Sequence, residues 1–185
     1  MTRPAWILIG LVCLGFAVIG VLRLSTGKRV QDATTFKTVY SQSKSVEFRL
    51  PTDWKSVPDG DNQMYYRDSG PGTLRLTVFI KDLESNSIEL ADLRKELQKT
   101  WGAALEEISP HPNGGVLWKS KDQPSVEEGV NIVTIFWVWA SQTGGRAVYA
   151  LYSYTAEKGI WAARRTQRDI AMLDREIRAA IVALK

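Results

Sequence analysis

The most constraining feature of this 185-residue chain is a long apolar hairpin at residues 130–155. Its first half, residues 130–140 (VNIVTIFWVWA), would place apolar, β-favouring side chains on both faces of a strand. A strand with one solvated face would alternate apolar and charged residues, so this one is predicted to lie in mid-sheet with other elements packed on each side. Gly144 and Gly145 allow a tight turn, and residues 146–155 are predicted to pair antiparallel with the first half.

The net charge of the chain comes entirely from its start. Arg3, Arg23, Lys28 and Arg29 precede the first acidic residue, Asp32, and they account for the formal net charge of +4. The other 20 of the 24 basic residues balance 20 acidic residues. A neutral domain lacks the positive field of a nucleic-acid-binding protein, so no nucleic-acid partner is predicted.

An apolar, uncharged run at residues 6–22 precedes Arg23. As a helix it would span about 26 Å, close to the roughly 30 Å hydrocarbon core of a bilayer, and it predicts one transmembrane helix retained as a signal anchor. A cleaved signal peptide and a lipoprotein signal at Cys13 stay open as alternatives. Against them, no good cleavage site follows the run, and Gly10 stands where a lipobox needs leucine.

The orientation of this anchor is left open by the sequence. Basic residues are denser after the apolar run than before it, and the positive-inside tendency would then keep the domain in the cytoplasm. A short basic start followed by an anchor is instead typical of proteins whose domain lies outside the cytoplasm. Cys13 is the only cysteine, so disulfides do not indicate the compartment.

Composition and spacing divide the chain into three parts: an anchor with its basic flank at residues 1–29, a linker at residues 30–35, and one domain at residues 36–185. The domain alternates strand patterns with two amphipathic helix patterns. The predicted fold class is α+β, with an antiparallel sheet of about seven strands in ββββαβββα order, flanked by two helices on opposite faces and preceded by one transmembrane helix.

The elements of this domain follow from alternation, helical spacing and turn residues. The predicted strands are residues 36–40, 46–50, 63–68, 73–81, 116–121 and the two halves of the hairpin, with residues 57–62 as a turn. The first helix is predicted to begin near Asn86 and to end its apolar stripe at Leu105 and Ile108, before Pro110. The last helix is predicted over residues 161–184. Its buried stripe would hold Ile170, Leu173, Ile177, Ile181 and Leu184.

One segment carries a resemblance to a known family. Residues 46–54 (VEFRLPTDW) are an alternating strand that runs into Pro-x-x-Trp, and Tyr65, Tyr66 and a second alternating strand follow. With the order of strands and helices, this pattern resembles the Mog1/PsbP/DcrB-like superfamily over nearly all of residues 36–185. The resemblance implies an αβα sandwich around an antiparallel sheet, acting as a non-enzymatic binding or assembly module. No functional residue carries over, because no site motif of that superfamily is recognised in the chain.

Candidates for catalysis are few. The only histidine, His111, lies between two prolines, so neither a nucleophilic triad nor a histidine-based metal site is expected. Carboxylates that could act as acid and base occur in turns or near a helix end, where water screens them. These are Glu106 with Glu107, Glu127 with Glu128, and Asp59 with Asp61. We expect no catalytic residue, no metal, no cofactor and no enzyme activity.

The candidate partner-binding residues gather at the start of the last helix. They are Arg164, Arg165 and Arg168, with Lys158 nearby. Their charges oppose the helix macrodipole, so helix stability does not account for them. They could meet acidic lipid head groups or an acidic protein patch, and the alternative is ion pairing with Glu157 and Asp169. Most tryptophans are predicted to be core, with Trp54 and Trp161 as candidates to line a binding groove at the sheet rim.

Together these patterns predict a single-pass inner-membrane protein of a bacterium. Its domain, outside the cytoplasm in the preferred orientation, would be a non-enzymatic binding or assembly module for a protein partner at the membrane surface. The alternative is a carrier of a small apolar ligand or peptide, with an aromatic pocket between sheet and helix. A cofactor-free hydrolase is a more distant alternative.

Overall fold

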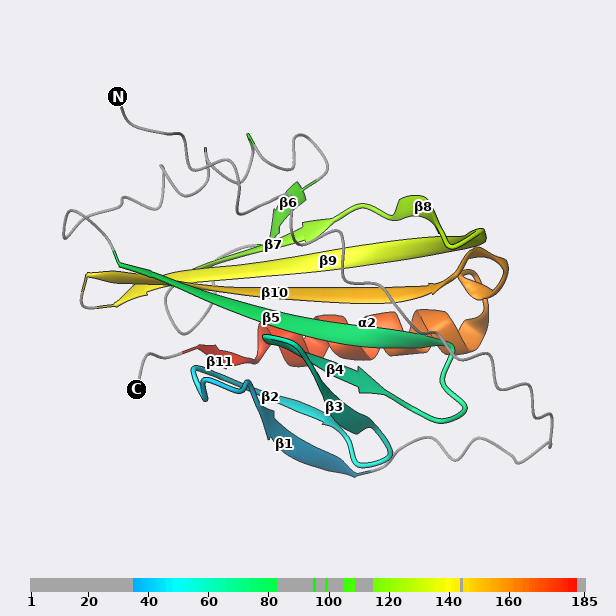
Figure 1. Ribbon diagram of the computed structural model, residues 1–185, viewed down its shortest axis with the longest axis horizontal. Coiled ribbons are helices and arrows are strands. Elements are labelled where there is room, and N and C mark those ends of the chain that lie inside the picture. The colour runs from blue at the N-terminus through cyan, green and yellow to red at the C-terminus, as the bar shows by residue number, and fades with distance from the viewer. Residues whose placement is uncertain are drawn as a thin grey trace. The chain divides into compact units, whose positions relative to one another are not determined.

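The computed structural model describes residues 35–82, 95, 99, 105–108, 115–143 and 145–182 (Figure 1). They belong to one unit of the chain, Ala33–Lys185. The predicted membrane anchor and most of the predicted first helix lie outside the described residues, so both stay predictions. Within that first helix Lys95 and Lys99 are described, and both have helical backbone.

Eight strands form one antiparallel sheet around the predicted hairpin. Its order is β3-β4-β5-β10-β9-β7-β6, and β8 pairs with β9 beside that path. The strands are β3 (Lys55–Asp59), β4 (Asn62–Tyr66), β5 (Gly72–Asp82), β6 (Leu105–Ile108), β7 (Val116–Ser120), β8 (Gln123–Glu127), β9 (Val130–Thr143) and β10 (Arg146–Glu157). β9 has 14 residues and β10 has 12, and they pair from Arg146 opposite Thr143 to Glu157 opposite Ile132. The prediction that residues 130–140 lie in mid-sheet is confirmed.

β9 is buried on both faces, as its composition predicted. Trp137 and Trp139 are fully buried in the main core on one face. Val138 points to the other face and belongs to a second buried cluster with Trp118 of β7. Because successive side chains of a strand alternate between faces, the run Trp-Val-Trp supplies both cores at once.

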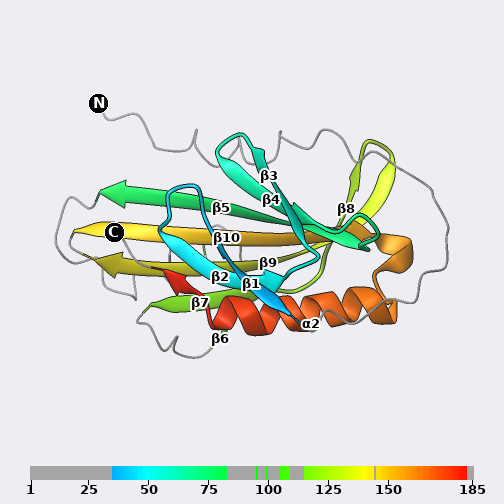
Figure 2. The ribbon, with the colours of Figure 1, turned by 90° about the horizontal axis from the view of Figure 1, so that it is seen from below.

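The main core is closed by a helix and a second, smaller sheet. The small sheet has the order β1-β2-β11, with β1 (Phe36–Tyr40), β2 (Val46–Pro51) and β11 (Ile181–Val182). A short 3-10 helix η2 (Lys158–Ile160) follows β10 and leads into α2 (Arg164–Arg178). The small sheet and α2 lie side by side on the same face of the large sheet (Figures 1 and 2).

The first three residues of the predicted apolar stripe form the buried side of α2. Ile170, Leu173 and Ile177 are buried, and they join the main core with Phe48 and Leu50 of β2. Phe48 lies between two tyrosines at edge-to-face geometry, with centroid distances of 5.5 Å to Tyr65 and 5.4 Å to Tyr152.

The prediction of one seven-stranded sheet is wrong in detail. The first hairpin forms as predicted, but β1 and β2 pair with β11 in a separate sheet. β3 occupies the first half of the segment predicted as a turn, residues 57–59, and β8 was not predicted. Each of these two strands contains a proline, Pro58 or Pro124, which is tolerated at a sheet edge but weakens the strand pattern in the sequence.

The predicted extension of the first helix to Ile108 is also wrong. Leu105–Ile108 is strand β6, paired with β7 from Leu105 opposite Ser120 to Ile108 opposite Leu117. Leu105 and Ile108 are three positions apart, which fits one turn of a helix. A pattern of only four residues is too short to exclude a strand. Pairing with β7 decides the conformation, and it places Glu106 and Glu107 in β6 instead of near a helix end.

The last helix is shorter than predicted. It begins at Arg164 instead of Trp161 and ends at Arg178, after which the chain turns at Ala179 and Ala180 into β11. Ile181, predicted to be buried, is 48% exposed on the small sheet, whereas its neighbour Val182 is buried. Pairing of β11 with β2 therefore ends the helix before its apolar stripe does.

None of the helices within the described ranges is long and apolar enough to cross a membrane. The apolar run at residues 6–22 lies outside those ranges, and the single-pass anchor stays a prediction.

Candidate partner-binding site

The predicted partner-binding residues differ in solvent exposure. Trp54 follows β2, and its backbone N–H donates to the carbonyl of Pro51. The residue is only 1% exposed. Trp161 follows η2 and is half-buried against the main core. Of the arginines, Arg164 and Arg168 are exposed and Arg165 is half-buried.

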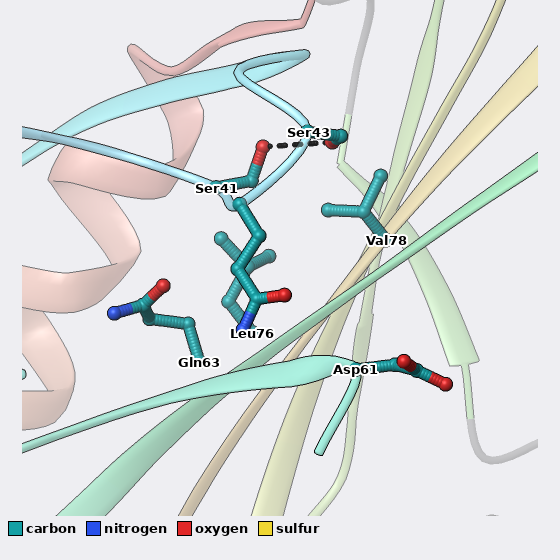
Figure 3. A pocket seen from close by; sticks show the side chains of 7 residues that line it. Ser41, Ser43, Asp61, Gln63, Leu76 and Val78 are labelled. Carbon is teal, nitrogen blue, oxygen red and sulfur yellow. Dashed lines mark hydrogen bonds between the residues drawn. The ribbon is translucent and has the colours of Figure 1, made fainter. Parts of the chain in front are cut away.

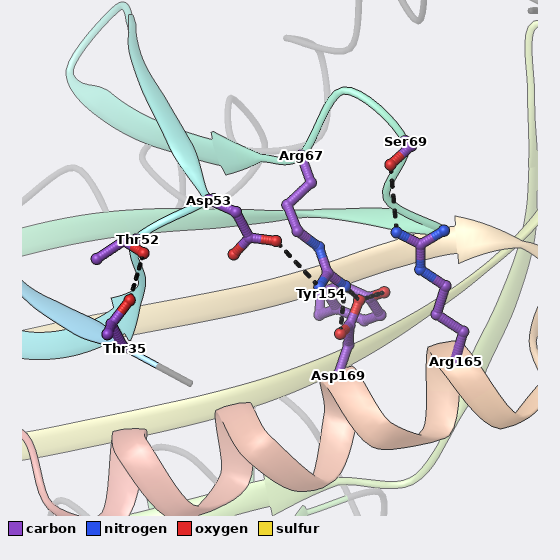
Figure 4. Close-up of polar contacts among 8 residues, drawn as sticks. All are labelled: Thr35, Thr52, Asp53, Arg67, Ser69, Tyr154, Arg165 and Asp169. Atoms are coloured by element: carbon purple, nitrogen blue, oxygen red, sulfur yellow. Dashed lines mark hydrogen bonds and ion pairs between the residues drawn. The ribbon is translucent and has the colours of Figure 1, made fainter. Parts of the chain in front are cut away.

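A buried ion pair lies under this region. Arg67, at the end of β4, extends its guanidinium onto both carboxylate oxygens of Asp169 on α2 (Figure 4). The side chains of the two residues are 10% and 7% exposed. Arg67 Nη1 also lies 3.6 Å from Oδ2 of Asp53, and its Cζ is 5.3 Å from the ring centroid of Trp54. The pair therefore joins α2 to the turns after β2 and β4.

Tyr154 of β10 completes the cluster from the sheet side. Its hydroxyl donates to Oδ2 of Asp169 at 3.4 Å (Figure 4). The first residue of β5 must be glycine here, since a Cβ on Gly72 would lie 2.4 Å from the carbonyl of Thr155 and 2.7 Å from the Tyr154 ring. The close approach of β5 to β10 is therefore part of what encloses the carboxylate.

Burial governs the protonation of this cluster. Burial raises the pKa of Asp169 above its ordinary value, and the neighbouring Arg67 guanidinium only partly offsets that effect. Burial, followed by the nearby Asp169 carboxylate, also raises the pKa of Tyr154. Tyr154 therefore stays a neutral hydrogen-bond donor, and the cluster is a structural lock between helix and sheet.

The segment that leads into α2 is held by hydrogen bonds. Trp161 Nε1 donates to Oδ2 of Asp122 at 2.7 Å, and its ring lies 6.3 Å from that of Tyr154 at an interplanar angle of 38°. Thr166 Oγ1 donates to the carbonyl of Ile160, and Gln167 Nε2 to the carbonyl of Trp161, both at 2.7 Å. These bonds replace an N-cap, because residue 163 is alanine and makes no side-chain cap.

On this fixed segment lies a surface of apolar and basic side chains, which we call the α2 N-terminal surface. It comprises Lys158, Ile160, Trp161, Arg164 and Arg168. Ile160 is 38% exposed, and the first turn of α2 contains no acidic residue. Arg165 is not part of this surface, since its Nη2 donates to Oγ of Ser69 in the turn after β4 at 3.3 Å (Figure 4).

Ion pairing of the clustered arginines with Asp169 was the alternative to a binding surface. Asp169 pairs with Arg67, a residue that the sequence did not single out, and not with an exposed arginine. The two lie 102 positions apart and share no motif, so only the fold brings them together. Arg165 lies close enough to help lower the pKa of Asp169.

Two of the carboxylates considered for catalysis, Asp59 and Glu127, lie near the same cation, Arg75. Asp59 pairs with Arg75, while Glu127 is the last residue of β8, opposite Val130. Burial and the neighbouring Glu128 raise the pKa of Glu127, although Arg75 opposes them. His111 lies outside the described residues. Within the described ranges, no group of three or more histidine, cysteine or acidic residues could hold a metal ion.

Comparison with known proteins bears on the fold. No protein-family model matches the sequence, and no curated protein matches it. Among solved structures, a protein of Bacteroides thetaiotaomicron matches with a TM-score of 0.55 and 20% identity over 80% of this chain. The chain spans about half of that protein, 49% of its length.

Two further structures match. LpqN of Mycobacterium tuberculosis, described as involved in cell envelope biogenesis, has a TM-score of 0.50 and 12% identity, covering 81% of this chain and 91% of LpqN. Cyanobacterial PsbP (CyanoP) of Synechocystis sp. PCC 6803 has a TM-score of 0.39 and 14% identity, covering 86% and 98%, a similarity too loose to support an argument by itself. The first two matches show similarity of fold alone. The resemblance to a PsbP/Mog1-like fold, drawn from residues 46–54 and the order of elements, agrees with them.

Proposed function

We propose that this chain is a membrane-anchored, non-enzymatic binding or assembly module, whose domain contacts an acidic protein partner through the α2 N-terminal surface. The observation that carries the proposal is the exposure of Arg164, Arg168 and Ile160 on a segment fixed by the Arg67–Asp169 pair beneath it. A fixed surface loses little conformational entropy on binding.

The chemistry of the surface favours an acidic partner. From Lys158 to Arg168 the sequence KGIWAARRTQR contains four basic residues and no acidic one. Arginine and tryptophan are enriched among residues that dominate binding energy, and an apolar neighbour such as Ile160 excludes water from their contacts. Trp54 is buried, so the proposal uses it as support for Arg67 and not as a contact residue.

The membrane part of the proposal comes from the sequence. Residues 1–29 would anchor the chain as a single-pass inner-membrane protein, and six linker residues reach at most about 20 Å. The domain, outside the cytoplasm in the preferred orientation, would then stay close to the bilayer surface. An alkaline phosphatase fusion after residue 185 tests the orientation: we expect activity, and an inactive but well-expressed fusion contradicts an extracytoplasmic domain.

The second helix of the predicted sandwich also belongs to this proposal. The chain leaves the sheet at the end of β5 and returns in β6, with β10, β9 and β7 between them. One face of these strands is already occupied by α2 and the small sheet. The second flanking helix, predicted from the sequence on the opposite face of the sheet, is part of this proposal because a connection between strands that are not neighbours has to cross the sheet.

The alternative function, an apolar-ligand carrier, receives less support. The aromatic side chains between the large sheet and α2, including Trp137 and Tyr152, are fully buried. A pocket in the described part of the chain lies elsewhere, at the turns between strands, and its lining is largely polar. We therefore keep the binding module as the proposed function.

A crosslinking pull-down of the tagged full-length chain from native membranes tests the proposal. The variant is Arg164→Gln with Arg168→Gln, and the matched control is Lys81→Gln with Arg146→Gln, two exposed cations at the other end of β10. We expect one protein to be captured by the parent and the control and to be lost, by about tenfold, with the variant. Equal capture by all three chains, or no specific capture, would contradict the proposed surface.

A further inference from the structure

A pocket of about 160 Å³ lies where the small sheet meets the large one (Figure 3). Its walls come from the β1–β2 turn, the β3–β4 turn, and strands β4 and β5. Leu76 and Val78 of β5 provide its apolar side, and polar groups come from Gln42, Ser43, Asp61 and Gln63. The pocket lies on a different part of the domain from the α2 N-terminal surface.

The two turns that form the pocket are fixed to each other. Gln42 Nε2 lies 3.4 Å from the carbonyl of Gly60 and 3.3 Å from that of Asn62, and it donates to both. Thr77 Oγ1 donates to Oδ1 of Asn62 at 2.5 Å. Within the β1–β2 turn, the N–H of Val46 donates to Oγ of Ser41 at 3.1 Å. The pocket is therefore present before any ligand arrives, as binding sites usually are.

The polar groups of the pocket carry one negative charge and no positive charge. The exposed Asp61 contributes a carboxylate, the serines and glutamines contribute neutral groups that can accept or donate hydrogen bonds, and no lysine or arginine lines the pocket. In the same hairpin Asp59 is neutralised by Arg75, whereas no cation among the described residues pairs with Asp61. An anionic ligand would therefore be repelled, and an ammonium group, with three N–H donors and a positive charge, would be satisfied.

Size and shape limit the ligand further. Liquid water occupies roughly 30 Å³ per molecule, so the pocket holds a group of about five heavy atoms. Pockets for whole drug-sized ligands are larger, about 300–1,000 Å³. Leu76, which is 1% exposed, and Val78 offer an apolar surface for methylene groups beside the carboxylate. A short alkyl stem ending in an ammonium group matches this combination.

The geometry points to this pocket as a binding site for a primary alkylammonium group, supplied by a lysine side chain of another protein or by a free aliphatic amine. This site does not depend on the proposed function, since the pocket and the α2 N-terminal surface have no residue in common. A lysine of the partner bound here would add a second contact, in which this chain supplies the negative charge instead of the positive one.

The test is an NMR titration of the ¹⁵N-labelled full-length chain in detergent micelles with n-butylammonium. We expect shifts confined to residues 41–43, 61–63 and 76–78, with a dissociation constant on the order of 1 mM for so small a ligand. The neutral and anionic analogues n-butanol and butyrate serve as controls and should give at least about tenfold weaker shifts. Shifts of equal size with n-butanol, or no localised shifts, would overturn the proposal.

Two variants with the same change of charge sharpen the test. Asp61→Asn should weaken n-butylammonium binding by about tenfold or more, and Asp68→Asn, an exposed acid outside the pocket, should leave it within about twofold. Equal binding by parent and Asp61→Asn overturns the proposal. A parallel titration with Nα-acetyl-lysine amide identifies the source: tighter binding than n-butylammonium assigns the pocket to a protein lysine, and weaker binding assigns it to a free amine.

Discussion

Two aspartates of α2, Asp169 and Asp174, tie the helix to the rest of the domain in different ways. Asp169 is buried under the N-terminal half and meets one guanidinium and one phenol. Asp174 is 20% exposed and accepts hydrogen bonds from three donors. These are Lys119 Nζ at 2.7 Å, Trp137 Nε1 at 2.9 Å and Arg178 Nε at 2.8 Å.

The two carboxyls respond to these surroundings in opposite directions. Burial raises the pKa of Asp169, because Arg67, with smaller contributions from Arg165 and Tyr154, only partly offsets the loss of hydration. Burial also acts to raise the pKa of Asp174, but the hydrogen bonds from Lys119, Trp137 and Arg178 outweigh it and hold the pKa below its ordinary value. Asp169 is the more deeply buried of the two, whereas Asp174 has the larger number of hydrogen-bonded partners, and both differences favour opposite directions of the pKa shift. The two contacts should therefore respond differently to mutation and to pH.

The largest expected effect comes from Arg67→Met, which leaves the buried Asp169 without its cation. We expect a loss of about 3–5 kcal/mol in the free energy of unfolding at neutral pH. The pKa of Asp169 should rise further, and a carboxyl whose folded pKa exceeds its unfolded value loses stability as pH rises between the two. The loss should therefore shrink towards pH ~4. Urea unfolding of the full-length chain, followed by tryptophan fluorescence, measures it.

A double variant checks the mechanism of this loss. Adding Asp169→Asn to Arg67→Met removes the uncompensated charge and should recover part of the stability at neutral pH. If the double variant is no more stable than the single one, Arg67 acts through packing on Trp54 and not through the carboxylate.

The next largest effect is expected from Asp174→Asn. It should lower the free energy of unfolding by about 1–3 kcal/mol at neutral pH, because the charged hydrogen-bond partners of Asp174 lose their ionised acceptor. A carboxyl with a lowered folded pKa contributes stability above its unfolded pKa and loses it as pH falls through the folded value. The free energies of unfolding of the parent and of Asp174→Asn should therefore become more similar as the pH falls. The same unfolding measurement against pH tests this, and a loss that grows in acid would contradict it.

Comparing the variants Asp169→Asn and Asp174→Asn tests whether the stability contributions of the two carboxyls change with pH in opposite directions. The cost of Asp169→Asn, about 1–2 kcal/mol in acid, should decrease as pH rises, since the parent then carries the burial cost of an ionised Asp169. The cost of Asp174→Asn should increase over the same range. Parallel pH profiles of the two variants would show that burial and donor number do not separate these sites.

The smallest effect on stability is expected from Arg164→Gln with Arg168→Gln, within about 0.5 kcal/mol, because both side chains are exposed. Arg165→Gln should cost more, about 1 kcal/mol, because it removes the bond to Ser69 and a charge near Asp169. Thermal unfolding of the three chains compares them. A large loss for the exposed pair would show that these arginines serve the fold, and would weaken the case for a binding surface.

The sequence predicted the parts of the fold that depend on long, regular patterns. The β9–β10 hairpin and the α2 stripe of Ile170, Leu173 and Ile177 are examples, since each repeats one period over several residues. β6 and β11 have four and two residues, too few for a period, and their conformation depends on the strands they pair with. For the same reason the division into two sheets could not be predicted locally.

The candidate site was predicted only where local charge indicated it. The clustered arginines were found because like charges at a helix N-terminus are unfavourable. Sequence spacing did not distinguish the anchored Arg165 from the exposed Arg164, since their difference depends on Ser69, far away in the chain. Arg67 and Asp169 were missed as a pair for the same reason, because each is an ordinary residue in its own segment.

The pairing of β11 with β2 has a consequence for the order of folding. Val182, almost at the end of the chain, lies opposite Val46 at the start of the domain, so the small sheet is complete only when its last strand is available. Bringing together residues so distant in sequence is slow, because the loop between them loses entropy before any contact forms. During synthesis, the apolar face of the first hairpin would therefore stay open until Ile181 and Val182 have left the ribosome.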